Sequence, residues 1–164
     1  MTTLSKKRKI TVVIITLLIA LTVAFIWYNS LKTQAQSAES SGRVYNTIKS
    51  VVDTVFGENT VPITHNGVRK AAHFSEFALL GAEICLLFIV LKKESVKWYL
   101  HALPYGLFVA AVDEGLQTLT DRGAALTDVL IDFSGYFAAV AIFLIIFIIK
   151  RKIKNKKAIK SAGK

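Results

Sequence analysis

Apolar residues occur along this chain in four long stretches that more polar segments separate. The stretches are Ile10–Tyr28, Ala71–Leu91, Trp98 to about Leu119, and Val129–Ile149. Because a helix rises about 1.5 Å per residue, each stretch can cross the roughly 30 Å hydrocarbon core of a bilayer. The third is apolar only as far as Val112 and carries polar residues in its last two turns. The pattern predicts an all-α integral membrane bundle of four transmembrane helices.

A shorter, amphipathic segment, Arg43–Phe56, lies between the first two stretches. Its apolar residues recur at three- and four-residue spacing, which places them on one face of a helix. The segment is too short and too polar to span, so we expect a helix on the outer membrane surface that ends at Gly57. The segment before it, Lys32–Gly42, is rich in Ser, Gln and Ala and predicts a solvated linker.

The chain is basic, with 21 Lys and Arg against 11 Asp and Glu, and 15 of the 21 lie beside the apolar stretches. They are Lys6, Lys7, Arg8 and Lys9 before the first, Lys92, Lys93 and Lys97 between the second and third, and Lys150, Arg151, Lys152, Lys154, Lys156, Lys157, Lys160 and Lys164 after the fourth. The positive-inside rule places these regions, and both termini, in the cytoplasm. We therefore expect basic residues that contact lipid head groups, and no nucleic-acid partner.

This topology divides the chain into four parts. We expect residues 1–28 to form a cytoplasmic N-terminus and a first span that is an uncleaved signal anchor, with a removed signal peptide as the alternative. Residues 29–68 then form the extracytoplasmic linker and amphipathic helix. Residues 69–149 form a three-span core, and residues 150–164 form a basic cytoplasmic tail.

Ionisable and amide side chains gather where three of the spans meet the outer surface. An ionised side chain at membrane depth costs roughly 2.5 kcal/mol or more, so such residues predict mutual pairing or a functional site. Spacings of three and four residues align the members on each helix, which predicts one shared polar pocket. The candidates are Arg69, Lys70, His73, Glu76, Asp113, Glu114, Gln117, Arg122, Asp128 and Asp132.

The side-chain chemistry suggests two kinds of role in this pocket. His73, Glu76, Asp113 and Glu114 are the candidate catalytic groups, because a histidine beside carboxylates can move protons. Arg69, Lys70, Gln117, Arg122, Asp128 and Asp132 are the candidate ligand-binding groups, with the cations suited to an anion. The His-x-x-Glu spacing at residue 73 does not match a zinc motif. Magnesium or manganese on Asp113, Glu114, Asp128 and Asp132 stays open, and the sequence does not identify a cofactor.

These residues carry a family resemblance. The segment Arg69-Lys70-x-x-His73-Phe74-x-Glu76 and the later series Asp113-Glu114-x-x-Gln117, Arg122, Asp128 to Asp132 and Gly135 resemble the VanZ-like family of bacterial membrane proteins. The chain departs from the family pattern at Thr120-Asp121, where many members have Pro-Gly. The resemblance implies a multi-pass protein of the bacterial cell membrane, and the family's founding member is associated with low-level teicoplanin resistance.

Three functions fit these observations. The first is a cell-envelope protein that binds or acts on an anionic lipid or lipid-linked precursor, with membrane lipids as its partners. The second is a non-enzymatic membrane scaffold whose charge cluster locks the fold. The third is a proton-coupled transporter that uses Glu83, a carboxylate inside the second span. For the pocket itself we expect a direct contact between helices from Arg69 or Arg122 to a carboxylate, with the amphipathic helix flanking the cavity.

Overall fold

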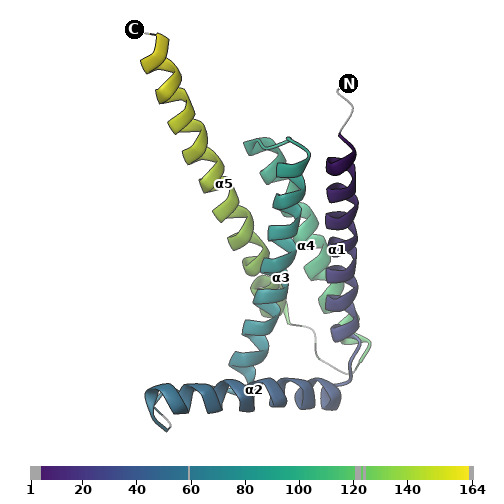
Figure 1. Ribbon diagram of the computed structural model, residues 1–164. Helices are drawn as coiled ribbons and strands as arrows, with labels where there is room; N and C mark the ends of the chain where they lie inside the picture. Colours follow the sequence, from purple (N-terminus) through teal and green to yellow (C-terminus); the bar gives the residue numbers. More distant parts are fainter. Residues whose placement is uncertain (1–4, 59, 121–122, 124, 163–164) are drawn as a thin grey trace.

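The computed structural model describes residues 5–58, 60–120, 123 and 125–162, and five helices form within them: α1 (Lys6–Ser30), α2 (Gln34–Phe56), α3 (His65–Val90), α4 (Val96–Thr118) and α5 (Leu126–Ala162). Helices α1, α3, α4 and α5 run alongside one another, and α2 lies across one end of them (Figure 1). Both chain termini lie at the opposite end. The prediction of an all-α fold is confirmed.

Three of the helices are long and apolar enough to cross a membrane: Lys6–Ser30, His65–Val90 and Leu126–Ile159. Helix α4 is not among them, so the prediction of four spans is confirmed only in part. The physical reason is that α4 carries Lys97, His101, Asp113, Glu114 and Gln117, which lower its mean hydropathy. Whether α4 also crosses the bilayer stays a prediction.

The surface of the bundle is more apolar than that of a water-soluble bundle, and several polar side chains are buried inside it. Large apolar side chains face outward on every long helix, including Leu21, Phe108 and Ile142, which are 65%, 60% and 57% exposed. The buried side chains include Asp113 and Asp132, at 0% and 1% exposed. In α4, Asp113 and Glu114 are buried, whereas Leu100, Leu107 and Phe108 are exposed, which is the arrangement that a hydrocarbon solvent favours.

Helix α2 begins nine residues before the predicted Arg43, at Gln34, so the prediction of a solvated linker over Lys32–Gly42 is wrong. The segment is helical because Thr33 and Gln36 form a capping box: the Thr33 hydroxyl accepts from the Gln36 amide, and the Gln36 side chain accepts from the Thr33 amide. The other end is as predicted. The helix stops at Phe56, and Gly57 takes a positive φ of 92°.

Helices α3 and α5 approach each other closely next to the predicted pocket. A Cβ atom added at Gly135 would lie 2.9 Å from the carbonyl carbon of Phe74, and one added at Gly81 would lie 2.7 Å from the carbonyl oxygen of Tyr136. Helix α4 is joined to this pair by the Tyr136 hydroxyl, which donates to the Ala102 carbonyl at 3.0 Å. The small residues let backbones pack at a distance that any side chain would prevent.

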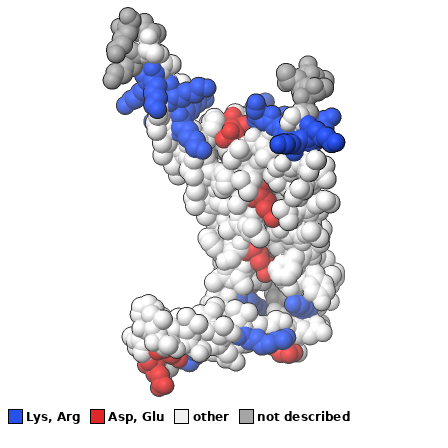
Figure 2. Space-filling view, viewed as in Figure 1, with Lys and Arg blue, Asp and Glu red and all other residues white. Residues whose placement is uncertain are grey.

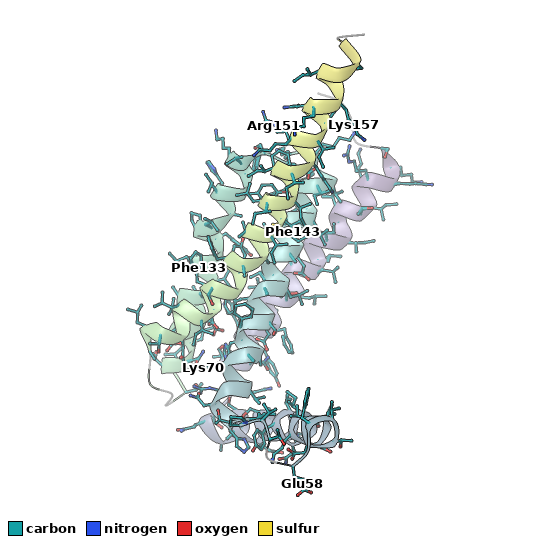
Figure 3. The ribbon with its side chains drawn as sticks, turned by 90° about the vertical axis from the view of Figure 1, so that its left-hand side faces the viewer. Glu58, Lys70, Phe133, Phe143, Arg151 and Lys157 are labelled. Atoms are coloured by element: carbon teal, nitrogen blue, oxygen red, sulfur yellow. The ribbon has the colours of Figure 1, made fainter. Side chains whose placement is uncertain are left out.

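Basic residues collect at the end of the bundle that holds the termini (Figure 2). Arg151 and Lys157 lie at this end, whereas Lys70 lies at the other end, near α2 (Figure 3). The α3–α4 connection, with Lys92 and Lys93, also lies at the end of the termini. The structure thus separates the basic end of the bundle from the end where the candidate site residues lie.

Candidate functional site

Three helices each supply one side chain to the centre of the site: His73 from α3, Asp113 from α4 and Asp132 from α5. The Nδ1 atom of His73 lies 3.3 Å from Oδ1 of Asp132 and 3.9 Å from Oδ2 of Asp113. One nitrogen or oxygen atom from each residue lies within 4.8 Å of the others. Since both carboxylates are buried, these groups interact through protein rather than through water.

Asp113 is held in place by hydrogen bonds from two helices. The Ser30 hydroxyl at the end of α1 donates to its Oδ1, and Nε2 of Gln117, one turn further along α4, donates to its Oδ2 at 2.9 Å. The Asp113–Gln117 contact follows from their four-residue spacing. Ser30 was not among the predicted residues, although its position at the C-terminal end of the first apolar stretch could have indicated it.

The Asp132 carboxylate is buried, and few contacts with other side chains replace its lost hydration. Its side chain is 1% exposed, and neither carboxylate oxygen has a hydrogen-bond partner among the described residues. Oδ1 is close to His73 but lacks the alignment of a hydrogen bond. A buried carboxylate in this condition is costly unless a proton or a cation neutralises it.

Arg69 lies next to this centre and pairs with Asp128 across the α3–α5 interface, at 3.6 Å. The predicted contact between an arginine and a carboxylate on different helices is confirmed. Arg69 and Asp128, together with Lys70, His73, Ile131 and Asp132, line a small cavity of about 10 Å³. Arg122 lies outside the described residues.

A larger cavity, of about 240 Å³, lies on the other side of His73, between α1, α2 and α3. Its lining includes Arg69, His73 and Glu76 from α3, Asn29 and Lys32 from the end of α1 and the following turn, and Ser37, Ser40 and Ser41 from α2. Asn29 donates to Glu76 at 3.4 Å. Helix α2 therefore flanks the cavity as predicted, with Val44 of the predicted segment and with the three serines of the turns that the sequence did not predict. We call this space the polar cavity.

An apolar groove adjoins the polar cavity. It has a volume of about 280 Å³ and is lined by Leu18, Leu21, Thr22, Phe25, Glu76 and Leu79, from α1 and α3. Phe25 and Glu76 also line the polar cavity, so the two spaces share a wall. We call this space the apolar groove. Its other residues lie on the apolar surfaces of two membrane-length helices.

Two further acids have contacts of their own. Oε1 of Glu114 accepts from the backbone amide of Ala125 at 2.5 Å, so this side chain ties α4 to the segment just before α5. Glu83 accepts from the Thr22 hydroxyl of α1 at 3.0 Å. Both contacts join different parts of the fold, and neither places the acid beside His73.

The structure thus brings together most of the predicted site residues. His73, Asp113, Gln117 and Asp132 form the centre, which we call the polar centre, and Arg69, Lys70, Glu76 and Asp128 line the adjacent cavities. Ser30, Asn29 and Lys32 of the α1 end, and the serines of α2, are additions that the sequence did not predict.

An apolar outer surface, membrane-length helices and a buried polar centre at one end define a multi-pass α-helical membrane protein. Comparison with protein families gives the particular group: the profile of the VanZ/LLP1 family matches residues 12–148, and the chain belongs to this family. No match was found among curated proteins or among solved structures. The matched region includes the whole polar centre and both motifs that carry the resemblance.

Proposed function

We propose that this protein binds an anionic lipid, or a lipid-linked envelope precursor, in the outer leaflet of the bacterial cell membrane. The observation that carries the proposal is the shared wall of the polar cavity and the apolar groove. A lipid has a polar head joined to an apolar chain, and these two adjoining spaces match that shape. The apolar groove, with Leu18, Leu21 and Leu79, offers the surface along which one chain lies.

The charge of the polar cavity favours an anionic head group. Lys32 and Arg69 supply positive charge, and Ser37 and Ser40 of α2 supply hydroxyl donors, whereas the Ser41 hydroxyl donates to the Ser37 carbonyl. An arginine binds phosphate or carboxylate through two parallel hydrogen bonds, which makes Arg69 the principal anion-binding group in the proposal. His73 and Glu76 line the same cavity and are the groups that can move a proton at the bound head group.

The orientation that goes with this proposal places the termini in the cytoplasm and the polar cavity at the outer surface. The positive-inside rule supports it, because the basic end of the bundle holds both termini. Helix α2 then lies along the outer surface, where its exposed Val51, Val55 and Phe56 can enter the interface. Helix α4 forms the fourth span, with its buried acids shielded by α1, α3 and α5.

A fold-locking role for the charges is the competing interpretation. The Arg69–Asp128 pair and the His73–Asp132 contact both connect α3 to α5, as a lock requires. The two interpretations predict different results for a substitution at Arg69. A lock predicts loss of folded protein in proportion to loss of function, whereas a binding group can be removed from a stable protein.

The test is lipid binding by the full chain purified in detergent, measured by native mass spectrometry with added phosphatidylglycerol or phosphatidylcholine. We expect preferential binding of phosphatidylglycerol, and binding weaker by about tenfold or more in Arg69→Gln, because a charged hydrogen bond contributes roughly 1.5–3 kcal/mol. The control is Arg43→Gln, which removes the same charge from an exposed pair with Glu39 on α2. Equal phosphatidylglycerol binding by both variants and wild type would refute the proposal, and an unstable Arg69→Gln would favour the lock.

Family membership extends the proposal to the cell. We propose teicoplanin susceptibility as a physiological readout, with cells that produce Arg69→Gln matching cells that lack the protein while cells with Arg43→Gln match wild type. Immunoblotting of the membrane fraction establishes that all the variants are equally abundant.

A further inference from the structure

We infer that His73, Asp113 and Asp132 form a binding site for one divalent transition-metal ion, Mn²⁺ or Zn²⁺. The inference goes beyond the proposed lipid binding and stands on the polar centre alone. Its first support is geometric. In a site with metal–ligand bonds of about 2.1 Å, two ligands of one ion lie roughly 3 to 4.2 Å apart. The His73 nitrogen lies 3.3 and 3.9 Å from the two aspartate oxygens, within this range.

The three ligands come from three different helices, which is the arrangement of many metal sites inside helical bundles. No two of them are neighbours on one helix, so their approach is not a by-product of helical spacing. The packing of α3 against α5 through Gly135 is what brings His73 and Asp132 together.

The second and independent support is the state of the Asp132 carboxylate. It is 1% exposed, and neither of its oxygens has a hydrogen-bond partner in the described part of the chain. Both oxygens are therefore available to a ligand that fits between the helices. A cation bound between the helices would neutralise this carboxylate, and an uncompensated charge at this depth is strongly destabilising.

The net charge of the polar centre gives a third argument. Asp113 and Asp132 carry up to two negative charges, and Arg69, which lines the small cavity beside Asp132, is paired with Asp128. A divalent ion would neutralise both carboxylates at once. Asp113 is also held by Ser30 and Gln117, and carboxylate ligands in metal sites are fixed by hydrogen bonds of this kind.

The donor set selects the class of ion. Magnesium and calcium prefer sites made only of oxygen, whereas one imidazole nitrogen with two carboxylates suits Mn²⁺ or Zn²⁺. The small cavity beside His73 and Asp132 measures about 10 Å³, which is close to the space that one water molecule needs. A metal-bound water in this cavity would be the fourth ligand of a tetrahedral Zn²⁺, or one of the additional ligands of Mn²⁺.

The competing account of the polar centre is a proton shared among the three side chains, with no metal. Metal titration separates the two. The full chain, purified in detergent without added lipid and stripped with EDTA, is titrated with Mn²⁺ while electron paramagnetic resonance measures the free ion, and Zn²⁺ is then added as competitor. We expect one ion per chain, and affinity about 100-fold lower or worse in Asp132→Asn.

The matched control is Glu83→Gln, which changes another buried acid, on α3, that contacts Thr22 rather than His73. It should bind the ion as wild type does, and its thermal unfolding temperature should rise with Mn²⁺ or Zn²⁺ in the same way. If Asp132→Asn does not fold, His73→Gln takes its place, because the His73 side chain is partly exposed. The inference is overturned if wild type binds neither ion at one per chain, or if the ligand variant binds as tightly as wild type. Since no lipid is present, this result is independent of the Arg69 test.

Discussion

Helices α3 and α5 are in close contact at Gly135, so the addition of a single methyl group there tests the geometry of the polar centre. In Gly135→Ala the new Cβ would lie 2.9 Å from the carbonyl carbon of Phe74, and also against its carbonyl oxygen. Carbon atoms pack best at about 3.5 Å or more, so α3 and α5 must separate by at least about 0.6 Å. The neighbour is backbone, which cannot rotate away as a side chain could. Overpacking of this kind typically costs about 1–3 kcal/mol.

The separation also reaches the polar centre, because Phe74 follows His73 in sequence and Gly135 lies one helical turn after Asp132. We therefore expect Gly135→Ala both to lower the free energy of unfolding by about 1–3 kcal/mol and to weaken ion binding. The assays are reversible unfolding in mixed detergent micelles and the Mn²⁺ titration. Gly115→Ala is the control: its Cβ meets nothing within 4 Å, and alanine favours a helix by about 1 kcal/mol over glycine. Equal stability of wild type and Gly135→Ala would refute the account of the α3–α5 interface.

Two further substitutions test single hydrogen bonds. Ser30→Ala removes a hydrogen-bond donor to Asp113. We expect roughly tenfold weaker Mn²⁺ binding in the same titration, because the hydrogen-bond partners of metal ligands typically contribute 10–100-fold to affinity. Unchanged affinity would mean that Ser30 does not orient the carboxylate. Thr22→Val removes the α1 donor to Glu83, and we expect the free energy of unfolding to fall by about 1–3 kcal/mol. Thr16→Val is its control in the unfolding assay, since Thr16 bonds only within its own helix, and an equal loss in both variants would contradict the role of the contact.

The sequence predicted those parts of the site that depend on spacing within one helix. Asp113 and Gln117 are four residues apart and are bonded, and Arg69 and His73 on α3 line the polar cavity together. The sequence also predicted that the polar residues of different helices lie at the same depth in the bundle. Successive spans run in opposite directions, so the end of one span and the start of the next lie at the same surface. Such inferences need only the periodicity of the helix and the order of the spans.

The features that the sequence did not predict depend on how helices rotate and approach one another. That Asp132 faces His73 is decided by the α3–α5 contact at Gly135, and no local pattern encodes that contact. The additional turns of α2 were missed because Lys32–Gly42 has no apolar period. These turns of α2 begin at a capping box, and they carry the serines that line the polar cavity.

The proposed lipid head group is negatively charged and the proposed metal ion is positively charged, so the two proposals are electrostatically compatible. An anionic head group in the polar cavity would lie beside His73, close to two buried carboxylates. Unit charges about 4 Å apart interact by roughly 4 kcal/mol where the effective dielectric constant is near 20, so ionised aspartates would oppose an anion there. A divalent ion at the polar centre would cancel that repulsion and leave the positive charge of Arg69 and Lys32 to attract the head group. Buried acids beside an anion-binding cavity are therefore consistent with lipid binding, provided that a metal ion or protons neutralise them.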